Sequence, residues 1–275
     1  MKTLYVSDLD GTLFNQDKLL TSFTTKAINK CIEKGMEFSI ATARMPYGCD
    51  YRLSCLALKT PSILSNGVFV YDFLHKKYHS VESINPTAFE QIIEIIHSAG
   101  LHCFVYTYKN DTISLYYDDQ SLEEQTQYFS KRALESCAEV VMIPNHNMFF
   151  DRSNVVYLAL TGTDEKLKPL SHSLQSISGI DFAYYLNIYN NLYCLEIFSD
   201  KANKKNALLK LKEMETIDRI VVFGDNLNDL SMIEIADRSY APNNALNVVK
   251  ERVTGILEDN NHDGVAKFLL KEFNL

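Results

Sequence analysis

The chain has 275 residues, of which 46% are hydrophobic and 23% charged. This composition is ordinary for a globular protein, and the length favours two domains or one domain with a large insertion. The formal net charge of −8, with no basic run, argues against nucleic acid as the main partner.

No apolar stretch approaches the roughly 20 residues that cross a bilayer, so no membrane partner is expected. The apolar part of the amino-terminal "MKTLYVSDLDG" is too short for a signal peptide and runs into aspartates. The six cysteines form no CxxC pair, which argues against zinc and favours free thiols in a reducing cytoplasm. They are Cys31, Cys49, Cys55, Cys103, Cys137 and Cys194.

The first third of the chain alternates between strand and helix patterns. A short apolar run predicts a buried strand over residues 3–10, and apolar spacing predicts a helix over 23–35 that stops at Gly35. Two further strands are predicted within 36–43 and 61–72, the latter with a Gly turn. This rhythm predicts a parallel sheet with right-handed crossovers.

The middle of the chain, from about residue 83 to 189, has a different character. A strong helix over 85–100 precedes two paired strands at 102–108 and 112–119. A second round follows, with a strand, a helix and a strand at 155–162, 164–177 and 181–189. The many Tyr and Phe residues here favour a half-buried aromatic sheet over a binding stack.

The first rhythm returns after about residue 190. A helix is predicted over 204–214, a buried strand over 218–225 and helices over 227–236 and 244–253. We therefore predict an α/β protein. Its Rossmann-like parallel-sheet core comprises residues 1–82 and 190–275, and residues 83–189 form an inserted α/β cap domain.

Unusual polar residues follow three of the predicted strands. Asp8 and Asp10 follow the first, Thr42 follows "EFSIA", and Asp225 follows "RIVVFG". In an open parallel sheet, ligands bind at the carboxyl ends of the strands. Carboxylates so close together raise each other's pKa unless a cation or a shared proton offsets the repulsion, or unless they lie exposed on a loop.

These residue types suit phosphoryl transfer. Asp8 could attack phosphorus as a nucleophile, and Asp10 could exchange protons with the leaving oxygen and the water. Asp8 and Asp225 supply the hard oxygens that Mg²⁺ prefers, and the cation would admit an anionic phosphate. Gly11 would let the chain turn sharply, and Lys204 at a helix start would add a positive charge.

Each residue taken alone also has an ordinary structural explanation. Asp225 and Asp229 in "GDNLND" could cap a helix, Thr42 is a common strand residue, and Lys204 could be a solvated helix residue. The joint placement at strand ends is what favours a site.

The chain resembles, over essentially its full length, the haloacid dehalogenase-like hydrolase superfamily and specifically its Cof-type phosphatases. The segments that carry the resemblance are "DLDGTLF", "ATAR", Lys204 in "NKKNAL", "GDNLND", "SNG" and "NNHDGVAKFL".

The resemblance implies a role for each matching residue. Asp8 is the nucleophile and Asp10 the acid–base residue. The residues implied to bind phosphate are Leu9, Thr42, Ala43, Lys204 and Asn228, with Leu9 and Ala43 acting through their backbones. The residues implied to bind Mg²⁺ are Asp8, Asp225 and Asp10, the last through its backbone carbonyl. The implied neighbours of the site are Asp229, Arg44, Asn66 and Asn244.

The sequence departs from the family pattern at three positions, one of which is "PNNA" at Pro242–Ala245, where the family pattern around Asn244 usually reads "GNA". Ala43 stands where the second motif usually has glycine, and Lys205 follows Lys204 where the family usually has glycine. The pattern leaves open which lysine faces the site, although the family register favours Lys204.

Together these observations predict a Mg²⁺-dependent phosphatase for small phosphorylated metabolites, acting through an aspartyl-phosphate intermediate. The alternatives are a phosphomutase, which uses the same intermediate, and a binding protein that has lost catalysis. The sequence does not specify the substrate, the cap residues that select it, or the oligomeric state.

Overall fold

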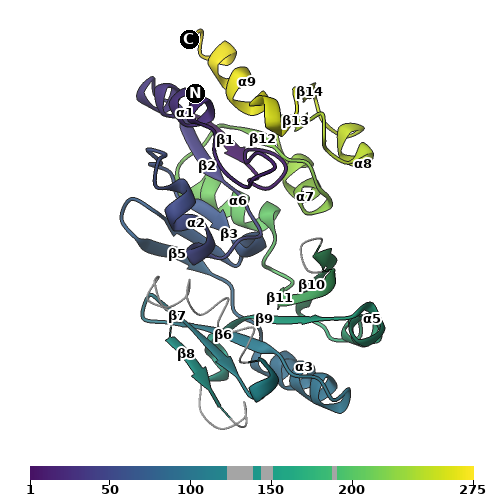
Figure 1. Cartoon of the computed structure of the whole chain (residues 1–275). Helices are drawn as coiled ribbons and strands as arrows, with labels where there is room; N and C mark the ends of the chain where they lie inside the picture. The colour runs from purple at the N-terminus through teal and green to yellow at the C-terminus, as the bar shows by residue number, and fades with distance from the viewer. Residues whose placement is uncertain (123–138, 144–150, 188–190) are drawn as a thin grey trace. The chain divides into compact units, whose positions relative to one another are not determined.

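The computed structural model describes residues 1–122, 139–143, 151–187 and 191–275 (Figure 1). Its contacts divide the chain into two compact units, described separately here: unit 1 is Met1–Ser80 with Asn203–Leu275, and unit 2 is Val81–Ala202. The sequence places the second junction earlier, between 189 and 190. The contact division falls later because β11 (Leu192–Ser199) pairs along its length with β10 (Ile180–Asn187).

The centre of unit 1 is a five-stranded sheet in the order β14-β13-β12-β1-β2, with every neighbouring pair parallel. Its strands are β1 (Thr3–Ser7), β2 (Glu37–Ile40), β12 (Arg219–Phe223), β13 (Arg238–Pro242) and β14 (Gly255–Leu257). β1 and β12 join the two ends of the chain in one sheet, as predicted, because both are short buried apolar runs.

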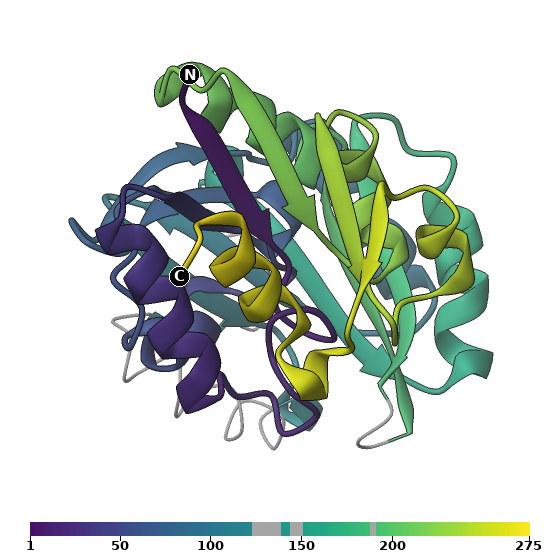
Figure 2. The ribbon, with the colours of Figure 1, turned by 90° about the horizontal axis from the view of Figure 1, so that it is seen from above.

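Helices cover both faces of this sheet, so each strand buries alternate side chains on opposite sides. Leu4 and Val6 of β1 belong to one core cluster with Leu208 of α6. On the other face, the rings of Tyr5 and Phe273 and those of Phe223 and Phe268 lie in contact. Figure 2 shows α1 and α9 lying along this second face. The helices of unit 1 are α1 (Ser22–Glu33), α2 (Pro46–Leu53), α6 (Lys204–Met214), α7 (Leu230–Ile233), α8 (Asn247–Lys250) and α9 (Gly264–Glu272).

The predicted Gly turn within residues 61–72 separates two strands. The 3₁₀ turn Ser65–Gly67, with positive φ at all three residues, reverses the chain between β3 and β4. β3 pairs antiparallel with β4, and a single parallel bridge between Ala41 and Ile63 connects it to the segment after β2, so the predicted parallel order continues to β3 only through this bridge. The strands of this three-stranded sheet are β3 (Ser62–Leu64), β4 (Phe69–Asp72) and β5 (Lys77–Val81).

Unit 2 is a six-stranded sheet with helices packed on it, in the order β10-β11-β9-β6-β7-β8. The pairs are antiparallel except β7 with β8. α3 (Pro86–Ser98) buries Phe89, Ile92 and Ile96 in one cluster with apolar residues of α5 (Asp164–Leu174). The remaining strands are β6 (Phe104–Lys109), β7 (Thr112–Tyr117), β8 (Glu139–Met142) and β9 (Val155–Gly162).

Two expectations reach beyond the described residues. Cys137 lies outside them, as do the last positions of the strand predicted over 181–189. Within the described ranges, no helix combines the length and the apolar character needed to cross a membrane.

Candidate active site

The candidate site of unit 1 begins where three parallel strands end. The backbone N–H of Asp8 donates to the carbonyl of Phe223 at 2.9 Å, and the N–H of Ala41 donates to the carbonyl of Ser7 at 2.9 Å. These bonds hold the segments after β1, β2 and β12 beside one another. The polar residues that follow these strands in the sequence therefore lie together at one edge of the sheet.

Lys204 connects two carboxylates at this edge. Its Nζ donates to Asp8 Oδ1 and to Asp229 Oδ1, each at 2.6 Å. The Lys204 side chain is fully buried, whereas Lys205 is only half-buried. α6 begins at Lys204, after the side chain of Asn203 caps it by accepting the N–H of Asn206. The first turn of α6 thus points Lys204 at the carboxylates.

Asp229 is fully buried and organises the loop that carries Asp225. Its Oδ2 accepts the backbone N–H groups of Asp225 at 2.9 Å and Asn226 at 3.0 Å. Gly224 permits this approach, because a Cβ there would lie 2.6 Å from Asp229 Cγ. With one oxygen on Lys204 and the other on two N–H groups, Asp229 acts as a positioning residue.

Asp225 faces the loop that follows β1. Its Oδ1 accepts a hydrogen bond of 2.7 Å from the hydroxyl of Thr12. Gly11 has φ +83, and a Cβ there would lie 2.4 Å from Asp225 Oδ2, so only glycine fits this turn. Thr12 was not among the residues predicted from the sequence, although its place beside Gly11 in "DLDGT" puts a hydroxyl next to the carboxylates.

Among the described residues of unit 1, the group whose side-chain oxygens lie within 4.8 Å of one another is Asp8, Asp225 and Asp229. Desolvation by burial raises the pKa of Asp8 well above its ordinary value, although the charge of Lys204 opposes the shift. Burial and the neighbouring Asp229 raise the pKa of Asp225 to about 6. Burial disfavours the ammonium of Lys204, but Asp229 and Asp8 outweigh it and raise the pKa of this lysine. The cluster therefore carries an excess of negative charge that a divalent cation would balance.

Asp10 lies beside the cluster with a different partner. Arg44 Nε and Nη2 donate to its two carboxylate oxygens, each at 2.6 Å. The Asp10 side chain is 43% exposed, and that of Arg44 is 17% exposed. This bidentate pair keeps the Asp10 carboxylate apart from the group formed by Asp8, Asp225 and Asp229.

The other residues named from the sequence lie in the segments around this edge. The Thr42 hydroxyl accepts the N–H of Arg44 at 3.2 Å. The Asn228 side chain donates to Asn66 Oδ1 at 3.0 Å, and that of Asn244 donates to the Gly11 carbonyl at 2.7 Å.

The two positions named for their backbones differ in exposure. Leu9 is buried, and its carbonyl accepts the N–H groups of Thr12, Leu13 and Phe14, which closes the turn after β1. Ala43 is exposed at the end of β2.

A profile of the haloacid dehalogenase-like hydrolase family matches residues 5–269. The chain belongs to this family. This haloacid dehalogenase-like hydrolase is 26% identical to the pyridoxal phosphate phosphatase of Escherichia coli (strain K12), over 95% of each chain. It is also 26% identical to the 5-amino-6-(5-phospho-D-ribitylamino)uracil phosphatase of Bacillus subtilis (strain 168), over 99% of this chain and 98% of the relative.

A solved haloacid dehalogenase-like hydrolase from Bacteroides thetaiotaomicron has the same fold. The TM-score is 0.78 at 23% identity, covering 99% of this chain and all of that one. The family and the α/β fold class predicted from the sequence are therefore confirmed, as is the prediction of a hydrolase related to phosphatases.

Proposed function

We propose that the chain is a Mg²⁺-dependent phosphatase that hydrolyses small phosphorylated metabolites, such as sugar phosphates or cofactor phosphates. The observation that carries this proposal is the placement of the Asp8 carboxylate. It lies at the end of β1, bonded to Lys204 and close to Asp225. A carboxylate held this way can attack phosphorus while its neighbours keep the phosphate in place.

The reaction has two steps at the same carboxylate. An oxygen of Asp8 forms a bond to phosphorus as the bond between phosphorus and the leaving oxygen breaks, which gives an aspartyl-phosphate. Asp10 supplies the proton to the leaving oxygen and then takes one from the water that cleaves the intermediate. To do so, Asp10 must release Arg44, whose guanidinium is suited to bind the arriving phosphate.

The donor set at this edge fits a hard divalent cation. Asp8 and Asp225 would hold Mg²⁺ together with the backbone carbonyl of Asp10, since both oxygens of Asp229 already have partners. The ion would supply charge neutralisation for the carboxylates and the phosphate. The pKa values of Asp8 and Asp225 stay raised although the charge of Lys204 lowers both of them. This remaining destabilisation of the carboxylates supports the assignment of a Mg²⁺ ion to this site.

Unit 2 is the proposed source of specificity. It is inserted between the segments that carry Thr42 and Lys204, and we assign it the role of a cap that contacts the leaving group. The names of the two curated relatives suggest pyridoxal phosphate and 5-amino-6-(5-phospho-D-ribitylamino)uracil as the first substrates to examine.

Release of inorganic phosphate tests this function directly. We expect turnover of a generic aryl phosphate and of one or more compounds in a panel containing hexose phosphates, nucleotides and pyridoxal phosphate. Activity should require Mg²⁺ and disappear in excess EDTA, and Asp225→Ala should abolish it or raise the Mg²⁺ requirement.

Three results would contradict the proposal. Full activity in excess EDTA would refute the requirement for Mg²⁺. Absence of turnover with every phosphate ester tested would favour a binding protein that has lost catalysis. Conversion of a hexose phosphate to its isomer without phosphate release would identify a phosphomutase instead.

The raised pKa of Asp225 predicts how Mg²⁺ binding depends on pH. With a pKa of about 6, this carboxylate is protonated at lower pH and then competes poorly for the cation. Mg²⁺ affinity should therefore weaken below about pH 6, by up to about tenfold per pH unit for one displaced proton. Calorimetric titration of the substrate-free protein with Mg²⁺ measures this without interference from the phosphate's own ionisation.

The Thr12→Val variant provides a matched comparison for this titration. The Thr12 hydroxyl favours the ionised form of Asp225, so its loss should raise the pKa of Asp225 further. The weakening of Mg²⁺ binding should then begin at higher pH than in the wild type. A Mg²⁺ affinity that stays constant between about pH 7.5 and about pH 5 would contradict this account of Asp225.

A further inference from the structure

A second cluster of metal-ligating side chains lies within unit 2. His97 belongs to the last turns of α3, His102 follows that helix, and Asp118 directly follows β7. His97 Nε2 lies 2.8 Å from Asp118 Oδ2, and His102 Nδ1 lies 3.0 Å from Asp118 Oδ1. One ligand atom from each residue lies within 4.8 Å of the others. Two imidazoles thus approach separate oxygens of one carboxylate.

The carboxylate of this cluster is buried, whereas its two imidazoles are partly exposed. The Asp118 side chain is only 6% exposed, whereas those of His97 and His102 are 35% and 38% exposed. A buried carboxylate needs a partner charge or several hydrogen bonds to offset its desolvation. Both imidazoles contact this carboxylate and are themselves partly exposed to solvent.

His102 lies between two carboxylates, and each of its ring nitrogens faces one of them. Its Nδ1 faces Asp118, while its Nε2 lies 3.4 Å from Asp119 Oδ2. A neutral imidazole has one N–H and can donate to only one of them. The hydrogen bond is made by Nδ1 to Asp118 Oδ1, whereas Nε2 and Asp119 lie only at ion-pair distance, so a bound cation would take the place of the Nδ1 proton. A carboxylate behind a histidine in this way is the usual support of a metal-binding histidine.

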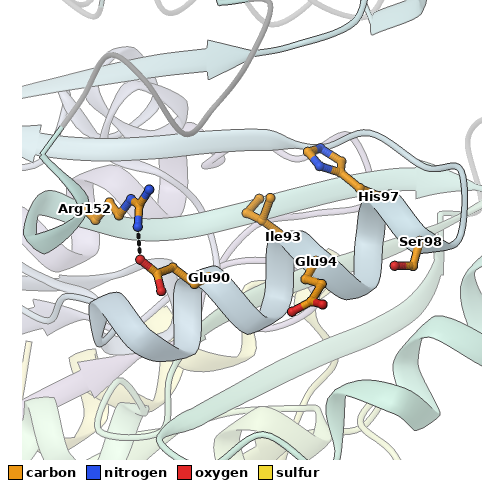
Figure 3. Close-up of a pocket in the computed structure, with 6 residues that line it drawn as sticks. All are labelled: Glu90, Ile93, Glu94, His97, Ser98 and Arg152. Carbon is orange, nitrogen blue, oxygen red and sulfur yellow. Dashed lines mark ion pairs between the residues drawn. The ribbon is translucent and has the colours of Figure 1, made fainter.

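A hollow on the surface of unit 2 lies beside one member of the cluster, His97. Figure 3 shows this hollow along α3, with His97 and Ser98 near the carboxyl end of the helix. Glu90 and Arg152 form an ion pair at its other end. Glu94, one turn before His97, also lines it and adds negative charge on the approach to His97.

A similar grouping in unit 1 shows what a purely structural arrangement looks like. His75 Nδ1 and His79 Nε2 both face Asp72 Oδ2, at 2.7 and 3.6 Å. The other oxygen of Asp72 accepts the backbone N–H groups of Leu74 and His75, which fixes the turn after β4. Asp72 therefore serves as a turn cap, and its two histidines supply a matched control.

We propose that His97, His102 and Asp118 form a zinc-binding site, with Asp119 orienting His102 and a water completing the coordination. Two imidazoles and a carboxylate are a ligand set that Zn²⁺ accepts in tetrahedral geometry. The absence of a CxxC pair argued against a zinc site built from cysteines, whereas the ligands proposed here include no cysteine. The competing description is an ion cluster in which protonated imidazoles neutralise Asp118.

Titration of the full-length protein with ZnCl₂, in excess Mg²⁺ to occupy the carboxylates of unit 1, tests the site. We expect one equivalent of zinc to bind in the wild type and in His75→Ala/His79→Ala. His97→Ala/His102→Ala should lose more than about 100-fold in affinity, and Asp119→Asn should lose about 10- to 100-fold. Substituted Co²⁺ should give the visible spectrum of a tetrahedral nitrogen–oxygen site without thiolate bands.

The outcomes separate the two descriptions. Absence of zinc binding in the wild type, or binding that survives in His97→Ala/His102→Ala, overturns the proposal. Loss of binding in Asp119→Asn with an unchanged circular dichroism spectrum supports it, because this variant alters no proposed ligand. Loss in the His75→Ala/His79→Ala control instead would place the zinc at Asp72 and also overturn it.

Discussion

Asp8→Asn is expected to lower kcat by about 10⁴-fold or more while the protein stays folded. The substitution keeps the size of the side chain and an oxygen that can accept from Lys204, but it removes the attacking charge and a metal ligand. Because burial raises the pKa of Asp8, a neutral amide should be well tolerated in the metal-free protein. Steady-state kinetics and thermal melting in EDTA measure the two effects.

Asp17→Asn is the matched control for this experiment. Asp17 is exposed in the same connection after β1, so the same chemical change there should alter neither kcat nor melting. Activity of Asp8→Asn close to that of the wild type would refute Asp8 as the nucleophile. Loss of activity in both variants would attribute the effect to the loop rather than to the carboxylate.

The convergence of Asp8 and Asp225 on one edge was predictable because both follow strands of a predicted parallel sheet. Each residue follows a short apolar run, and parallel strands bring their carboxyl ends to one edge. The cap-like α/β insertion was also readable, since the apolar period of α3 reappears as the buried positions of that helix. Apolar patterns within single elements, and the joint placement of polar residues after several of them, carried these predictions.

Contacts between side chains from distant segments were not predictable in the same way. The pairing of Asp10 with Arg44, and the bond from Thr12 to Asp225, depend on turn geometry that the sequence encodes only through Gly11. His97 and Asp118 also come from separate elements, and no fixed spacing in the sequence predicts that they lie in contact. Pairwise geometry of this kind appears only once the chain is folded.

Lys204→Ala is expected to reduce kcat/KM by an amount worth about 2–4 kcal/mol of transition-state stabilisation, whereas Lys205→Ala should change little. Successive helical residues point about 100° apart, so only one of the two lysines can face the carboxylates. The structure turns Lys204 inward, with Nζ at 2.6 Å from both Asp8 and Asp229. Its ammonium therefore offsets the nucleophile's charge and would attract the phosphate.

Removing Lys204 should also destabilise the fold, because it leaves two buried carboxylates without their shared cation. Loss of one partner from a buried ion pair costs about 3–5 kcal/mol, whereas a surface substitution such as that of the half-buried Lys205 stays within about 0.5 kcal/mol. Urea denaturation of both variants separates this loss from catalysis, and kinetics are measured only where the protein remains folded. Added Mg²⁺ should restore part of the stability of Lys204→Ala by supplying positive charge to Asp8. If Lys205→Ala is instead the damaging change, α6 begins in a different register and Lys204 is not the lysine that binds phosphate.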